Sequence, residues 1–217
     1  MKIDFLIGCE ESQEVTKAFR NMGIEAFSCD LQECSGGHPE WHIQRDIFEV
    51  IDEHPEIRVG IFFPPCTHLA VSGAPSFEAK RKDGRQQEGI DFFMKFTKLS
   101  FAWCIENPIS IMSNLYRKPD QIINPYYFGD PYPKKTCLWL HNLPKLLHTK
   151  EPNLFEPVKT WIEPQFVIFR SKKTKSGFSK YSPKHGVLGK GKGKERSKTE
   201  PGLALAMAQQ WSQFNNQ

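Results

Sequence analysis

The chain of 217 residues is long enough to bury one good hydrophobic core, so we expect one domain, 1–217, with a short insertion. Its mean hydropathy of −0.51 and the lack of a long apolar run exclude a membrane-spanning helix. The first residues enter a strand pattern without the apolar region of a signal peptide, which indicates a cytoplasmic protein. The six cysteines show no metal-ligand spacing, so we expect free thiols and no metal site.

Short apolar runs alternate with helix-like segments through the first half of the chain. This βαβ pattern predicts an α/β protein with a Rossmann-like, doubly wound, mostly parallel sheet. The expected strands are 2–8, 24–29, 42–46, 59–63, 99–105 and 136–140. The expected helices are 12–22, 47–53, 84–97 and 202–214, and the proline-rich stretch 144–164 is expected to be a loop.

The expected insertion, at about 141–199, is strongly basic. Between residues 170 and 198 it carries a single acidic residue among many lysines. Such a segment attracts the phosphates of nucleic acids, and the interleaved Phe178 and Tyr181 favour this interpretation. The alternative is a solvated loop, for which the glycine-rich stretch 189–193 is also typical.

Polar clusters follow two of the apolar runs, 59–63 and 99–103. The first cluster contains Cys66 after two prolines, and the second contains Glu106 and Asn107. Because ligands bind at the carboxyl edge of open α/β sheets, we expect these side chains on one rim. A thiol and a carboxyl group there would supply a nucleophile and an acid or base. A helix starting after the cysteine would lower its pKa, whereas the alternative is an inert buried thiol.

The first two strands suggest a nucleoside site. Gly8 ends the first strand before a helix, and Asp30 ends the second, where an acid can bind ribose hydroxyls. Asp46 could accept a hydrogen bond from an adenine amino group. The chain lacks the glycine pattern of a pyrophosphate loop, which favours a cofactor without phosphates, such as S-adenosylmethionine. The alternative is that both acids only cap helices.

Over nearly its whole length the chain resembles the DNA (cytosine-5) methyltransferases, in a compact form like those found in phages. The motifs that carry the resemblance are, in order, Phe5-Leu6-Ile7-Gly8, Asp30, Asp46-Ile47, Phe63-Pro64-Pro65-Cys66, Glu106-Asn107-Pro108, Phe128-Gly129-Asp130-Pro131 with Lys134-Lys135-Thr136, and Pro201-Gly202-Leu203-Ala204-Leu205-Ala206-Met207-Ala208. Departures are Cys9–Ser12 in place of further glycines, Thr67 for glutamine, Pro108 for valine, and lysines for arginines in the basic motif. The insertion is also too short for the family's target-recognition domain.

The resemblance implies a class I methyltransferase fold, with DNA as substrate and a phage or bacterial cytoplasm as its place. It implies that S-adenosylmethionine is held by Phe5, Gly8, Asp30, Asp46, Ile47 and Pro64. Cys66 would attack C6 of cytosine, Glu106 would donate to N3, and Asn107 would orient Glu106 or the Cys66 loop. Substrate contacts would come from Lys134, Lys135, Thr136, Lys190, Lys192 and Lys194.

Two alternatives remain open from the sequence. The missing recognition domain favours the same chemistry on a free nucleotide or on single-stranded nucleic acid. The altered glycine loop and the lysine replacements favour a non-catalytic nucleic-acid-binding protein that keeps the fold.

Overall fold

A computed structural model describes residues 2–152, 158–172, 174–183, 195 and 197–213. The described strands are β1 Phe5–Gly8, β2 Ala26–Cys29, β3 His42–Ile43, β4 Val59–Phe62, β5 Ala102–Pro108, β6 Gln121–Ile123, β7 Thr136–His141, β8 Val167–Arg170 and β9 Phe178–Tyr181. The described α-helices are α1 Glu14–Asn21, α2 Ile47–Glu53, α3 Phe77–Lys82, α4 Arg85–Phe96, α5 Met112–Leu115 and α8 Pro201–Trp211. Short 3₁₀ segments are η1 Pro39–Trp41, η2 Val71–Ser76 and η3 Pro125–Phe128.

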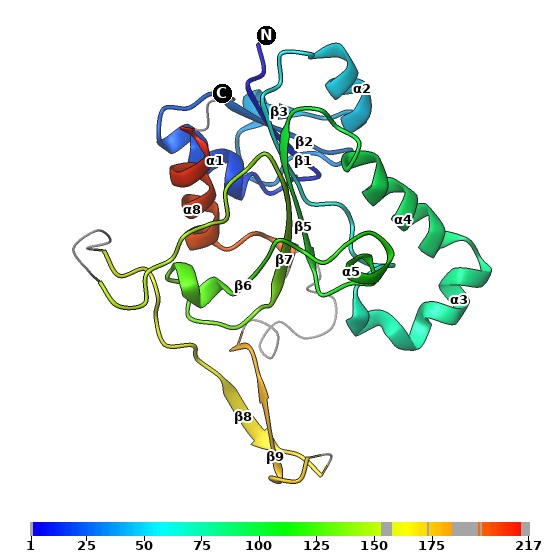
Figure 1. Cartoon of the computed structure of the whole chain (residues 1–217), viewed down its shortest axis with the longest axis vertical. Coiled ribbons are helices and arrows are strands. Elements are labelled where there is room, and N and C mark those ends of the chain that lie inside the picture. Colours follow the sequence, from blue (N-terminus) through cyan, green and yellow to red (C-terminus); the bar gives the residue numbers. More distant parts are fainter. Residues whose placement is uncertain (1, 153–157, 173, 184–194, 196, 214–217) are drawn as a thin grey trace.

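Seven strands form one mixed sheet in the order β3-β2-β1-β4-β5-β7-β6 (Figure 1). The pairs from β3 to β5 are parallel, and β7 runs antiparallel to both of its neighbours. The predicted α/β class with a mostly parallel sheet is therefore confirmed. The strand order reverses between β1 and β4, so the carboxyl ends of these two strands border the crevice where such sheets bind ligands.

Helices cover both faces of the sheet, and the alternation of side chains along the strands explains why. On β1, Phe5 and Ile7 join the core beneath α1 and α8, whereas Leu6 joins the core beneath α2 and α4. Figure 1 shows α1 and α8 on one side of the sheet and α4 on the other. Strands buried on both faces are mostly apolar, which explains the nearly continuous apolar runs in the sequence. Ser28 of β2 is a buried polar exception.

One strand differs from its prediction in a way that affects the site. The expected strand 99–105 is instead β5, Ala102–Pro108. β4 pairs only with residues 102–105, whereas β7 pairs with β5 as far as Pro108, with Glu106 opposite Leu138 and Asn107 opposite Cys137. The polar cluster is therefore part of the strand rather than a turn after it, because an antiparallel neighbour extends the strand beyond its apolar run.

The described part of the insertion includes an antiparallel ribbon formed by β8 and β9. It projects away from the sheet (Figure 1). The expected loop 144–164 contains no helix or strand among its described residues. Sequence patterns also missed α3, α5 and β6, which are short, whereas α2 has its predicted bounds. No described helix is long and apolar enough to cross a membrane.

Candidate active site

The loop after β4 carries Cys66 to the carboxyl edge of the sheet. The Cys66 carbonyl accepts hydrogen bonds from Leu69 N at 3.0 Å and Ala70 N at 2.9 Å, which closes a tight turn. Asn107, 1% exposed, donates from Nδ2 to the Pro64 carbonyl at 3.0 Å. Asn107 was expected to orient either Glu106 or the Cys66 loop, and this hydrogen bond matches the second role. Because β4 and β5 are parallel neighbours, Cys66 and Glu106 share one edge, as expected.

Cys66 is partly buried, and the electrostatics of its thiol differ from the expectation. Burial and the nearby charge of Glu106 raise its pKa, whereas Lys134 and Lys80 act in the opposite direction. A turn and η2 follow the cysteine rather than an α-helix. The expected lowering of the pKa by a helix start is therefore wrong, because no helix begins there.

Glu106 is the second reactive group on this edge. Burial raises its pKa to about 7, and Glu200 also raises it, whereas Lys134 and a hydrogen bond from Thr136 lower it. A carboxyl group with this pKa exchanges protons readily at neutral pH, which suits a general acid.

In the basic motif after residue 131, Lys134 and Thr136 make their contacts within the protein. Lys134 Nζ lies 3.2 Å from Glu200 Oε1 and 3.3 Å from Oε2, and the Glu200 side chain is only 1% exposed. Thr136 is buried, and its hydroxyl oxygen lies 3.3 Å from the Lys134 carbonyl oxygen. Lys135 is exposed. Lys134 is thus an electrostatic neighbour of Glu106 and Cys66, and its partner Glu200 was not found from the sequence.

The closing motif packs onto the loop that precedes Lys134. A Cβ at Gly202 would lie 1.9 Å from the Phe128 carbonyl oxygen, so glycine is required there. Gly202 N donates to Asp130 Oδ2 at 2.8 Å at the start of α8. This contact fixes Glu200 beside the site.

Of the proposed nucleoside residues, Gly8 ends β1, Asp30 directly follows β2, and Asp46 follows β3 at the start of α2. A Cβ at Gly8 would lie 2.6 Å from the Phe62 ring and 2.9 Å from the Ile47 side chain, so packing alone requires this glycine. Asp30 Oδ1 accepts from Gln32 N at 2.9 Å. Asp46 caps α2 through Oδ1, so the capping alternative describes its contacts.

Phe5 and Pro64, two other predicted cofactor residues, are less well placed to contact a cofactor. The Phe5 ring packs against Phe19 at a centroid distance of 5.1 Å, at the amino end of β1. Pro64 is buried next to the Cys66 loop, where its carbonyl is bound by Asn107. Lys190, Lys192 and Lys194 lie outside the described residues.

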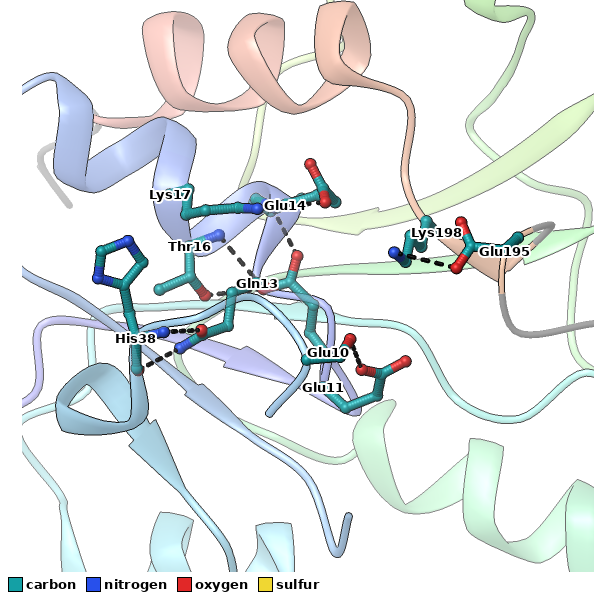
Figure 2. Close-up of polar contacts among 11 residues, drawn as sticks. Glu10, Glu11, Gln13, Glu14, Thr16, Lys17, His38, Glu195 and Lys198 are labelled. Carbon is teal, nitrogen blue, oxygen red and sulfur yellow. Dashed lines mark hydrogen bonds and ion pairs between the residues drawn. The ribbon is translucent and has the colours of Figure 1, made fainter. Parts of the chain in front are cut away.

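A buried acid occupies the start of α1, where the family has further glycines. Glu10 accepts hydrogen bonds from Val15 N at 2.6 Å, Thr16 N at 3.2 Å and Thr16 Oγ1 at 2.7 Å (Figure 2). Burial raises its pKa to about 7. A helix N-terminus is where phosphates bind in dinucleotide sites, so the chain fills that position with its own carboxyl group.

The loop around residues 35–38 is held against the same segment. Gln13 Nε2 donates to the His38 carbonyl at 2.8 Å, and His38 N donates to Gln13 Oε1 at 3.1 Å (Figure 2). Ser35 Oγ also donates to a Glu11 carboxylate oxygen. These contacts hold the 35–38 loop against the segment that joins β1 to α1.

Comparison with protein-family models and with curated proteins found no match.

Proposed function

We propose that this protein is an S-adenosylmethionine-dependent methyltransferase that methylates C5 of cytosine in DNA through a covalent adduct at Cys66. The observation that carries the proposal is the common edge of β4 and β5, where the Cys66 loop is tied to Asn107 and faces Glu106. The strand order 3-2-1-4-5-7-6 is consistent with class I methyltransferases and supports it.

The residues that follow β1, β2 and β3 fit a nucleoside cofactor without phosphates. In the described part of the chain, Oδ2 of Asp30 and of Asp46 accepts no hydrogen bond, which leaves both for ribose hydroxyls and an adenine amino group. The Glu10 carboxyl group already accepts the hydrogen bond of Val15 N at the start of α1, so it occupies the position where a phosphate would bind. Bound S-adenosylmethionine would supply an electrophilic methyl group.

The chain's own groups account for activation of the base. Cytosine C5 is a weak nucleophile, and addition of the Cys66 thiolate to C6, with a proton from Glu106 to N3, yields an enamine that is nucleophilic at C5. After methyl transfer a base removes the C5 proton, and the electron pair of that C–H bond re-forms the C5–C6 double bond and expels Cys66 as thiolate. The N3 proton then returns to the Glu106 carboxylate, which restores neutral 5-methylcytosine and the protonated acid. Within a duplex the cytosine must leave the stack to reach this edge.

The pKa values indicate which of Cys66 and Glu106 carries a proton at neutral pH. Burial raises the pKa of the Cys66 thiol above its ordinary value, whereas that of Glu106 is about 7. Just above neutral pH, Glu106 is therefore ionised and Cys66 keeps its proton. The reactive form has a Cys66 thiolate and a protonated Glu106, and it carries the same number of protons as this resting form. Transfer of one proton from Cys66 to Glu106 therefore generates the reactive form.

Two observations favour the other candidate functions. The described insertion offers a small ribbon rather than a domain, which favours a nucleotide or single-stranded substrate. The raised pKa of Cys66 favours a non-catalytic binding protein. Mass spectrometry of nucleosides after incubation with labelled S-adenosylmethionine separates the three. Label in 5-methylcytosine from duplex DNA supports the proposal, label only from single strands or a nucleotide supports the second, and no label supports the third.

We predict that Asp30→Ala weakens S-adenosylmethionine binding by about tenfold or more, since a hydrogen bond to a charged group contributes about 1.5–3 kcal/mol. Titration calorimetry on the folded protein measures this. Asp52→Ala, an exposed position on α2, is the control and should bind like the parent. Equal affinities for all three proteins would show that Asp30 is no cofactor residue.

The ribbon should supply phosphate contacts. Arg170 and Lys175 are exposed, and Lys180 Nζ lies 5.3 Å from the Phe166 ring centre. The ribbon therefore presents basic side chains next to an aromatic side chain. Replacing all three basic residues by Gln should lower the slope of log affinity against log salt by roughly 1 to 3, about 0.9 per lost contact. The control variant replaces Lys2, Lys95 and Lys98, exposed near the amino edge. If both triple variants keep the parental slope, the ribbon does not bind DNA.

A further inference from the structure

The backbone directly after Cys66 is held by two long side chains from neighbouring helices. Lys80, on α3, is 9% exposed and donates from Nζ to the Thr67 carbonyl at 2.6 Å. Gln86, on α4, is 4% exposed and donates from Nε2 to the His68 carbonyl at 3.1 Å. Two successive carbonyls after the cysteine are therefore fixed from outside the loop.

The position of Lys80 is unusual for a lysine, because a buried ammonium normally has an anionic partner. Its hydrogen bond goes to a neutral carbonyl, and no carboxylate among the described residues pairs with it. The loop also wraps closely around the ammonium, since a Cβ at Gly73 would lie 3.3 Å from Nζ. A buried cation without a counter-ion favours the appearance of negative charge nearby.

The negative charge that the proposed chemistry creates here is the Cys66 thiolate. We propose that Lys80 is a positioning residue for Cys66, which both fixes the loop and offsets the charge of the thiolate, and that Gln86 fixes the loop alone. This inference rests on the proposed function for its catalytic meaning.

Three charged groups act on the cysteine, each from a different element. Glu106 on β5 opposes ionisation, whereas Lys134 before β7 and Lys80 on α3 favour it. The charge of Lys134 is offset by Glu200, with which it pairs at 3.2 Å. Of the two lysines, Lys80 is therefore the one whose positive charge is not offset by a carboxylate among the described residues.

The test measures thiol reactivity, which does not depend on methyl transfer. The intact chain is alkylated with iodoacetamide at a series of pH values, and modification of Cys66 is followed by peptide mass spectrometry. Only the thiolate reacts, so the rate of Cys66 alkylation rises with pH through a midpoint. Lys80→Met should move this midpoint upward by about one pH unit, which makes alkylation below the midpoint roughly tenfold slower. Lys80→Arg should restore the midpoint.

The matched control is Lys82→Met, at an exposed lysine of the same helix that pairs with Glu78 at 2.9 Å. Its midpoint should equal that of the parent. Lys80→Gln removes the charge but keeps an N–H donor, and it replaces Lys80→Met if that variant does not fold. Gln86→Leu should leave the midpoint unchanged and lower kcat with little change in KM.

The outcomes separate this inference from the proposed function. A shifted midpoint without any methylated product would retain the role of Lys80 and remove the methyltransferase proposal. An unshifted midpoint in folded, uncharged Lys80 variants would overturn the inference, even if the protein methylates DNA.

Discussion

Cys66→Ser is expected to lower methyl transfer by about 10⁴-fold or more, because removal of a catalytic nucleophile has effects of this size. The fold should be retained, since the hydrogen bonds that close the Cys66 turn are made by backbone groups. S-adenosylmethionine affinity should change little, because the thiol acts on the base. Radiolabel transfer and calorimetry on the same preparation measure both quantities.

DNA that contains 5-fluorocytosine provides a direct readout of the same step. Fluorine cannot leave C5 as a proton does, so the adduct with the cysteine should persist and be located by peptide mass spectrometry. Cys34→Ser is the control, at another partly exposed free cysteine, and should form the adduct normally. An adduct on a different cysteine, or full activity of Cys66→Ser, would contradict the assignment.

The features that the sequence predicted are those set by local patterns. Continuous apolar runs identified the strands, and the βαβ order then placed Cys66 and Glu106 on one edge. The end of β5 was wrong because it depends on pairing with β7, which no local pattern records. Asp46 shows a related limit: an acid before a helix has the same sequence signal whether it caps the helix or binds a ligand.

The groups that the sequence missed act through contacts between distant residues. Lys134 was expected as a substrate contact, but its pairing with Glu200, 66 positions away, leaves no local signal in the sequence. Lys80 lies in a run of charges of a kind that is usually solvated, yet packing against the Cys66 loop buries it. Glu10 was visible only as a departure from the glycine pattern. Burial of a charge depends on the tertiary fold, so these roles could not be predicted from residue type.

Glu106→Gln is expected to lower the rate of methyl transfer by about 10²–10⁴-fold, the usual contribution of a general acid. Gln can still donate a hydrogen bond to N3 but cannot transfer a proton. The same change is expected to stabilise the fold at neutral and alkaline pH. A gain in stability together with a loss of activity is the signature of a group held in an unfavourable state for function.

The pH dependence of that stability follows from the raised pKa. In the folded chain the pKa of Glu106 is about 7, against an ordinary value of 4.5. Below pH 4.5 both states are protonated, and the carboxyl group has no differential effect. Between the two pKa values the unfolded chain loses its proton first, so the parent loses stability as pH rises. The loss reaches roughly 3 kcal/mol above pH 7, at about 1.4 kcal/mol for each pKa unit.

Urea unfolding of the parent and of Glu106→Gln at pH 5 and pH 8 tests this directly. The variant should gain stability over the parent on going from the lower to the higher pH, because glutamine has no charge to bury. Glu88→Gln, at an exposed position of α4, is the matched control and should show no such gain. If the difference between parent and Glu106→Gln is the same at both pH values, Glu106 is ionised as easily in the folded chain as in the unfolded one. It could then not hold at neutral pH the proton that the proposed addition to cytosine requires.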